Sequence, residues 1–327
     1  MAINAESGVT FRRDLSAVAT EFAAEEARRW GFIGPQVAPV FSVPEAEGTY
    51  PVLCREQFLK ADDVNRAEDG HYNVVDGHVG SQSFTCEDYG LESLLDDRKR
   101  RRYASFFDME VGTQKLLIHK ILLAQERRIA ALAMDTTGTY SAVTVGTSWS
   151  NASATILSDV ATGVDAIGGR TGMPPEMISL ILTRSDFRYV CRNTEILAQV
   201  SSTYGLDSGI RPGYLQAAQI AHVLGIKQVL VGSGQYDTKG EAVTASLSAI
   251  WPSGYAQLAV LAEPGDPLES PSAWRTMRWT DDAPTDVVVE RYRDDARRGD
   301  VLRVRQDTDE VATSEADLAN YQLDLTA

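Results

Sequence analysis

Two stretches of the chain carry apolar residues at the spacing of one helix face. Near the start, Leu15, Val18 and Phe22 recur at this spacing and predict a short amphipathic helix. A longer pattern covers about 108–134, where Asp108 can cap the first turn and no proline interrupts the helix. At 1.5 Å per residue this second helix would span about 40 Å, which is long for a small domain. Its pattern positions are Ile118, Ile121, Leu122, Gln125, Ile129 and Leu132.

The stretch 49–104 alternates short strand-like pieces with polar sequence. Strands are predicted at 50–53 and 82–86, on either side of the polar residues 60–70. A stretch with so few consecutive apolar positions cannot fill a core of its own. We therefore expect a long two-stranded projection that lies on another surface.

The second half of the chain alternates predicted helices and strands. One helix is expected to end at Gly168-Gly169, and Ser185 is expected to cap a short second helix. A third helix should start at Pro212 and end at Gly225. Strands are predicted at 178–183, 228–231, 247–251, 256–261, 275–279, 287–292, 301–305 and 318–323. Because no βαβ unit repeats, the predicted fold class is α+β.

Composition and length are consistent with a chain that folds around buried cores. The chain has 327 residues, 43% of them apolar, which suffices for one large or two modest domains. Its longest strongly apolar run covers only 178–182, so no membrane span is expected. The first residues lack a basic region followed by an apolar core, so we expect no secretion signal and a protein used in a cytoplasm. The widely spaced Cys54, Cys86 and Cys191 indicate free thiols, not a disulfide framework.

The formal net charge of −15 argues against a general nucleic-acid binder, because a negative field repels polyanions. A container for DNA remains compatible with this charge, since its wall benefits from not adhering to its contents.

Motifs of the common enzyme classes are missing from the sequence. It holds no G-x-S-x-G, Walker A, HExxH, GxGxxG or EF-hand pattern. The segment 232–234 has a Gly-Ser-Gly sequence but lacks a third glycine, which favours a plain turn over a phosphate cradle. His71, His78 and Cys86 do not have the spacing of a structural zinc site. We therefore predict no catalytic residues, no cofactor and no metal.

One run of basic residues stands out at 98–102. It can be a solvated turn, a nucleic-acid contact or a clamp between subunits. The clamp is favoured over the nucleic-acid contact, because the run stands alone in an acidic chain whose segment from Asp281 onward holds 13 acidic and 6 basic residues. The inter-subunit contact candidates in this run are Arg98, Lys99, Arg100, Arg101 and Arg102.

Four local motifs occur in an order that resembles one family. They are the stretch 171–177 followed by a strand and Ser185-Asp186-Phe187, the stretch 224–232, Ile250-Trp251-Pro252 and the stretch 290–294. Together with the order of the elements, this resembles the major capsid proteins of tailed bacteriophages, which have the Hong Kong 97-type fold. Pro252 departs from the family's pattern, in which a glycine follows the tryptophan.

The resemblance implies a division of the whole chain into the parts of that fold. An N-terminal arm would cover 1–48, and a β-hairpin called the E-loop would cover 49–104. The first part of the P-domain, with the long spine helix, would be 105–155. The A-domain would be 156–284, and the C-terminal strands of the P-domain would be 285–327.

The resemblance also implies a structural function without catalysis. The chain would form hexamers and pentamers of an icosahedral shell around double-stranded DNA, as part of a virion assembled in the host cytoplasm. A separate scaffolding protein is expected, since no long segment precedes the arm, and portal and decoration proteins are further expected partners. Some relatives crosslink an E-loop lysine to an asparagine of a neighbour, and Lys60 and Asn320 are the candidates here. The alternatives are a nanocompartment shell of the same fold and a soluble α+β enzyme.

Overall fold

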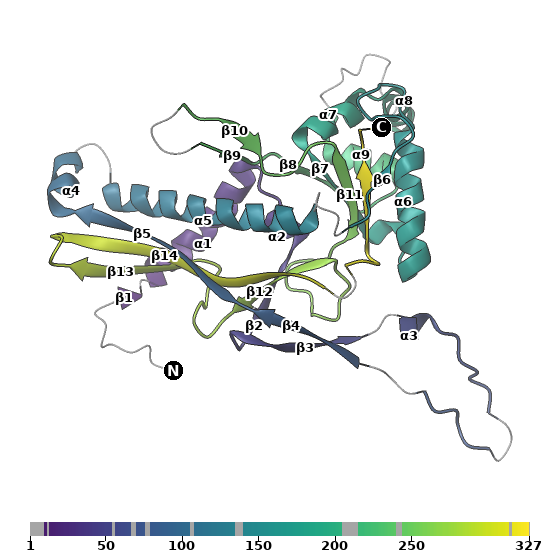
Figure 1. Cartoon of the computed structure of the whole chain (residues 1–327), viewed down its shortest axis with the longest axis horizontal. Helices are drawn as coiled ribbons and strands as arrows, with labels where there is room; N and C mark the ends of the chain where they lie inside the picture. The colour runs from purple at the N-terminus through teal and green to yellow at the C-terminus, as the bar shows by residue number, and fades with distance from the viewer. Residues whose placement is uncertain are drawn as a thin grey trace.

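A long helix and two β-sheets organise the protein (Figure 1). In this computed structural model, the long helix runs along one sheet and its C-terminal end reaches the second sheet. No helix among the described residues combines the length and apolar content that crossing a membrane requires. The structure describes residues 10–11, 13–53, 56–66, 70–75, 79–104, 108–134, 140–204, 215–239, 244–313 and 316–326.

The long helix α5 (Met109–Ala133) confirms the helix expected at 108–134. Its first turn is capped by Asp108, whose Oδ1 accepts hydrogen bonds from the backbone N–H groups of Glu110 (2.9 Å) and Val111 (3.5 Å). The N-terminal half of α5 packs into one apolar core through Leu117, Ile118 and Ile121. Its C-terminal half packs into a second core through Ile129, Ala130 and Ala133. The helix therefore ties the two halves of the protein together.

A six-stranded sheet lies beneath the first half of α5. Its longest strand, β14, pairs antiparallel with β5, β12 and β13. Helix α1 (Arg13–Trp30) covers this sheet beside α5, and its Ala19 and Ala23 join their shared core. The six strands are β1 (Thr10–Phe11), β2 (Val40–Val43), β5 (Glu87–Asp96), β12 (Trp274–Trp279), β13 (Val288–Asp294) and β14 (Gly299–Ala312).

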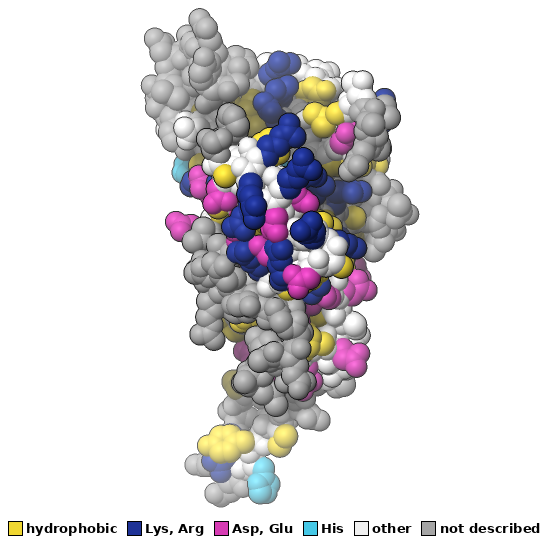
Figure 2. Space-filling view, turned by 90° about the vertical axis from the view of Figure 1, so that its left-hand side faces the viewer, with side chains coloured by type: hydrophobic (Ala, Val, Ile, Leu, Met, Phe, Trp, Pro, Cys, Tyr) yellow, Lys and Arg dark blue, Asp and Glu magenta, His cyan; other side chains and the backbone are white. Residues whose placement is uncertain are grey.

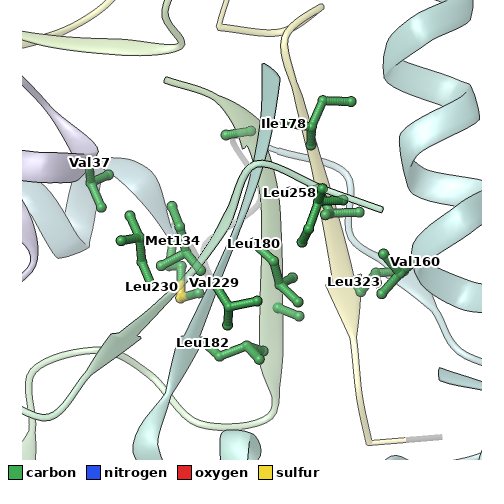
Figure 3. Packing of buried hydrophobic residues seen from close by; sticks show 14 of the residues in the cluster. Val37, Met134, Val160, Ile178, Leu180, Leu182, Val229, Leu230, Leu258 and Leu323 are labelled. Atoms are coloured by element: carbon green, nitrogen blue, oxygen red, sulfur yellow. The ribbon is translucent and has the colours of Figure 1, made fainter. Parts of the chain in front are cut away.

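A five-stranded sheet with helices against it forms the other half of the protein (Figure 1). Its order is β6-β15-β11-β7-β8, and every residue of β7 is buried. Figure 3 shows Leu180 and Leu182 of β7 beside Val229 of β8 and Leu258 of β11. The strands are β6 (Val143–Thr144), β7 (Ile178–Thr183), β8 (Gln228–Gly232), β11 (Tyr255–Val260) and β15 (Asn320–Asp324). The helices are α6 (Ile156–Thr171), α7 (Arg184–Arg192), α8 (Thr194–Tyr204) and α9 (Ala217–Leu224).

Short elements connect and extend the two halves. Strands β3 and β4 form the hairpin that projects from the body, and they pair from Glu47↔Thr85 to Leu53↔Val79. These elements are α2 (Gly34–Val37), β3 (Glu47–Leu53), α3 (Glu56–Leu59), β4 (Val79–Thr85), α4 (Asp97–Tyr103), the 3₁₀ turn η2 (Pro175–Met177), β9 (Gln235–Asp237) and β10 (Leu247–Ala249).

Several strands lie in a different place from the one expected. The projection expected over 49–104 is shorter, because β5 pairs with β14 at ten positions and is part of the sheet. Strand β12 was expected with the A-domain at 156–284 but lies in the six-stranded sheet, whereas β15 was expected with 285–327 but lies in the five-stranded sheet. The chain crosses between the sheets more often than a division by sequence position allows. Whether the parts act as separate domains stays a prediction.

The expected arm at 1–48 also contributes to the body of its own chain. Helix α1 packs on α5, and β2 pairs in parallel with β12 from Val40↔Thr276 to Val43↔Trp279. In the part of the arm that the structure describes, the apolar face of α1 is therefore covered within the subunit.

Three predicted helix boundaries differ from the observed ones. Helix α6 continues through Gly168-Gly169 and ends at Gly172, whose φ of +66° is the left-handed conformation that favours glycine. Ser185 lies inside α7, which starts after Thr183 without a side-chain cap. Helix α9 ends at Gly225 as expected but starts only at Ala217, and the expected start at Pro212 lies outside the described residues.

Candidate subunit-contact surface

The basic run forms a short helix at one end of the molecule. Strand β5 ends at Asp96, whose Oδ1 accepts hydrogen bonds from the backbone N–H groups of Arg98 and Lys99, both at 2.9 Å. This cap starts α4, and basic residues occupy its last turn, where they interact favourably with the helix dipole. The run is thus a capped helix and not an irregular turn.

One residue of the run, Arg100, points back into its own subunit. Its guanidinium contacts Asp300 Oδ2 of β14 at 3.2 Å and Glu110 Oε2 of α5 at 3.1 Å. Arg291 of β13 contacts the same two carboxylates at 2.5 Å and 3.0 Å. This network joins α4, α5 and the sheet. It differs from the expectation that a neighbouring subunit supplies the partners of Arg100.

The Asp97 carboxylate at the start of α4 is also used within the chain. Arg293 of β13 donates two hydrogen bonds to it, at 2.7 and 2.9 Å. This paired geometry holds the pKa of Asp97 below its usual value. The position of α4 relative to β13 is therefore set by charged groups of one subunit.

The other four cations of the run face solvent. Their side chains are exposed, and no other described residue forms an ion pair with any of them. Figure 2 shows this end of the molecule, where Lys and Arg side chains gather around a few acidic ones. We call the four exposed cations of the run the cationic face; they are Arg98, Lys99, Arg101 and Arg102.

The C-terminal carboxylates expected to pair with this run are largely engaged inside their own chain. Arg305 contacts Asp282, Glu290 (3.1 Å) and Asp307 (2.8 Å). Arg128 of α5 contacts Glu310 at 2.6 Å. These carboxylates are therefore paired within the chain, and a contact of this segment with a neighbouring subunit stays a prediction. A sequence count of acidic residues could not show this pairing, because the partners come from distant elements.

Burial changes the acidity of one of these carboxylates. Desolvation raises the pKa of Asp307 to about 6, although the nearby Arg305 acts in the opposite direction. Asp307 itself is 3% exposed.

The hairpin β3–β4 is anchored to the body at its base. Tyr50 and Phe84 pack with Val43 and Met277, and the Tyr50 hydroxyl donates a hydrogen bond to Gln82 at 2.5 Å. Beyond this anchor the described residues are mostly exposed, and several of them are apolar. Val64 and Val74 are 93% exposed, Tyr72 is 74% exposed and Val75 is 68% exposed. The prediction from the sequence emphasised the polar residues here and missed this apolar strip.

The two residues considered for a crosslink differ in solvent exposure. Lys60 is exposed on the projecting segment. Asn320 is 4% exposed in β15, and its Nδ2 donates a hydrogen bond to the Ala316 carbonyl at 2.5 Å. The Asn320 amide is therefore not on the surface of the subunit. A Lys60 contact with another subunit stays a prediction.

The sites considered for chemistry have ordinary structural roles in the described residues. Ser233 donates its backbone N–H to the Gly31 carbonyl at 3.1 Å, and a Cβ at Gly232 would lie 2.3 Å from the Trp251 ring, so this glycine is needed for packing. Cys86 Sγ is 3.7 Å from the Met277 carbonyl oxygen, and His71 is exposed. His78 lies outside the described residues. Where the structure is described, no three His, Cys, Asp or Glu side chains group around a possible metal.

A buried carboxylate that the sequence did not single out joins three segments. Glu126 of α5 accepts hydrogen bonds from the backbone N–H groups of Ile33 (2.9 Å) and Gly34 (2.7 Å) and from Trp251 Nε1 (2.7 Å). Burial raises its pKa, and these donors partly offset that rise. The sequence offers one signal for a buried role of Glu126: it lies four residues after Leu122, on the apolar face of the helix.

Solved structures with the same fold are known. A phage-related protein from Bordetella bronchiseptica RB50 matches with a TM-score of 0.68 and 19% identity, over 94% of this chain and 96% of its own. The capsid of cyanophage P-SCSP1u matches with a TM-score of 0.55 and 10% identity, over 88% and 86%. A virus-like particle from Pyrococcus furiosus matches with a TM-score of 0.54 and 9% identity, over 95% and 99%.

By sequence, no family model matches the chain, and no curated protein matches it significantly. The similarity is thus one of three-dimensional structure, and it extends over nearly the whole length of each chain. The chain therefore has the Hong Kong 97-type fold of phage capsid proteins.

Proposed function

We propose that this protein is a phage major capsid protein, which assembles with copies of itself into an icosahedral shell around double-stranded DNA. The observation that carries the proposal is the match of 88% of the chain to a solved phage capsid, beside the match of 94% of the chain to a phage-related protein. The unit would be a hexamer or pentamer of this chain, and the shell would be part of a virion that assembles in the host cytoplasm. A scaffolding protein, a portal and decoration proteins are the further partners that such a shell would use.

The projecting hairpin supports self-association. Its apolar strip, with Val64, Tyr72 and Val74 mostly exposed, is covered by no other described part of the chain. Exposed apolar side chains at the end of a projection are costly in water unless another surface covers them. A neighbouring copy would supply that surface, so part of the stability of each subunit would come from assembly.

Two buried carboxylates with raised pKa values have structural partners, which supports a non-catalytic role. Asp307 lies in an ion-pair network with Arg305, and Glu126 accepts hydrogen bonds from Ile33, Gly34 and Trp251. Such groups stabilise a fold and are not by themselves evidence for acid–base chemistry.

A nanocompartment shell is the second candidate, because a virus-like particle matches this chain about as well as the cyanophage capsid does, so the fold is not confined to particles that are named phage capsids. The contents of the particles decide between the two. The expressed protein should be purified as particles and treated with nuclease and detergent. DNA of uniform length inside particles from infected cells supports the capsid, whereas a single packaged enzyme supports the compartment. A protein that remains a compact monomer with and without a scaffold contradicts both.

A further inference from the structure

Two groups of exposed charges that form no ion pair with another described residue lie apart from each other on the subunit. One is the cationic face of α4, defined above. The other is a group of carboxylates where β3 begins and β5 begins. The four carboxylates are exposed, and none of them forms an ion pair with another described residue. We call them the acidic band; they are Glu45, Glu47, Glu87 and Asp88.

Backbone pairing brings the acidic band together. Glu47 pairs with Thr85 across the hairpin, and the Cys86 N–H donates to the Ala46 carbonyl at 2.8 Å. The segments around residues 45–47 and 87–88 are therefore adjacent. Between these segments, burial raises the pKa of the Cys86 thiol to about 11, and Asp309 of β14 adds to this rise.

Strand β5 separates the two charged surfaces. Strand β5 carries the acidic band at its start and leads into α4 at its end, ten residues later. At about 3.3 Å per residue, the two surfaces are roughly 30 Å apart. Since salt screens charges beyond about 8–10 Å, they cannot neutralise each other within one subunit. Another copy of the chain can supply each surface with a complement of opposite charge.

We propose that the cationic face of one subunit docks on the acidic band of the next, in a head-to-tail contact between copies of this chain. This inference rests on the proposed function and names the surfaces and charges through which the copies recognise each other. A head-to-tail contact uses two different patches, so it closes into rings when the rotation between subunits allows. Opposite charges on the two patches select this orientation over head-to-head contacts, because like charges repel.

The test is a charge reversal with a rescue. Arg101→Glu with Arg102→Glu reverses the cationic face, and Glu47→Lys with Glu87→Lys reverses the acidic band. Each pair alone should raise the protein concentration needed for half-assembly by about tenfold, which corresponds to about 1.4 kcal/mol per contact. The four changes together should restore assembly to within about twofold of wild type. Sedimentation velocity at about 50 mM and about 300 mM salt measures this, and wild type should assemble less well at the higher salt.

The matched control keeps the net charge of wild type but leaves like charges on the cationic face and the acidic band. It combines Arg101→Glu and Arg102→Glu with Asp165→Lys and Glu176→Lys, two exposed carboxylates elsewhere on the subunit. Like the rescue variant it retains the wild-type net charge of −15, and it should stay impaired. Thermal melting of each unassembled variant should match wild type. If a reversal lowers the melting temperature, the neutral Arg101→Gln and Arg102→Gln variant replaces it, with an expected effect of the same sign.

The outcomes separate this inference from the proposed function. Two results would show that the docking contact is wrong while the capsid function stands. Either the reversal variants assemble as well as wild type, or the control variant assembles as well as the four-fold variant. If wild type itself never assembles, the proposed function fails. A further outcome would overturn the contact and assign the cationic face to nucleic acid. In that outcome wild type binds a short DNA duplex, Arg101→Glu with Arg102→Glu abolishes this binding, and the four-fold variant does not restore assembly.

Discussion

Glu126 Oε2 accepts a hydrogen bond from the backbone N–H of Gly34 at 2.7 Å. The contact joins α5 to the first turn of α2, and Glu126 Oε1 also accepts a hydrogen bond from Trp251, which lies in the same core as Ile33. A Cβ at residue 34 would lie 2.5 Å from the same carboxylate oxygen, so only glycine fits here without displacement. One buried carboxylate thus holds α2 and Trp251 against the C-terminal half of α5.

Removing this carboxylate should destabilise the subunit. Glu126→Ala leaves three buried N–H donors without their acceptor, and we expect the free energy of unfolding to fall by about 3 kcal/mol. Urea unfolding of unassembled subunits measures the change. Asp165→Ala, at an exposed position of α6, is the matched control and should shift stability by less than about 0.5 kcal/mol. Equal shifts in the two variants would show that Glu126 does not hold these segments.

Arg100 and Arg101 should differ although they are neighbours in the sequence. Arg100→Ala removes contacts to Glu110 and Asp300 and should cost the subunit about 1 kcal/mol, since the side chain is partly exposed and Arg291 still serves both carboxylates. Arg101→Ala should leave subunit stability nearly unchanged. The comparison is made by urea unfolding at low salt. A larger loss for Arg101→Ala than for Arg100→Ala would invalidate the assignment of Arg100 to its own subunit.

Two acidic residues should produce opposite pH dependences. Burial raises the pKa of Asp186 to about 6. The folded state therefore favours its neutral form, and the stability associated with it is lost as pH rises from about 4 through 6. Arg293 lowers the pKa of Asp97, so its contribution is present at higher pH and is lost as pH falls through the folded pKa.

The free energy of unfolding, measured against pH in wild type and in each variant, tests both signs. From pH 4 to 6, wild-type stability should fall relative to Asp186→Asn. Over the acid range below pH 4, it should fall relative to Asp97→Asn as the pH decreases. Parallel curves for wild type and Asp186→Asn would mean that Asp186 is not desolvated in the folded subunit.

A methyl group at Gly232 should be poorly tolerated. Its Cβ would lie 2.3 Å from the ring of the fully buried Trp251, so the Gly232→Ala variant must displace a packed ring at a cost of about 1–3 kcal/mol. Gly146→Ala is the control, because its Cβ would meet nothing within 4 Å. Thermal melting of both variants measures the difference, and an unchanged midpoint for Gly232→Ala would contradict the packing described here.

The sequence predicts the elements whose causes are local. Helix α5 was predicted nearly to its ends, because its apolar period and the Asp108 cap both lie within the helix. Strand β14 was predicted only at 301–305 but runs from Gly299 to Ala312. Its polar residues Gln306, Asp307 and Thr308 are buried by pairing with β5 and β12 and by ion pairs, and these partners are distant in sequence.

The candidate site was predicted in position but not in detail. A run of five basic residues predicts a charged surface, and α4 provides one. That Arg100 turns inward depends on Glu110 and on Asp300, which lies 200 residues away. The acidic band depends likewise on the hairpin that brings Glu47 beside Glu87, which composition alone does not show.

Electron microscopy of the full-length protein, expressed with and without a scaffolding protein, is the direct test of the proposal that this chain forms a shell. We expect hollow closed particles with icosahedral symmetry, built from hexamers and pentamers of this chain. Their reconstruction should show the strip with Val64, Tyr72 and Val74 covered by a neighbouring subunit. Particles that never form, with a monodisperse monomer under every salt and scaffold condition, would contradict it.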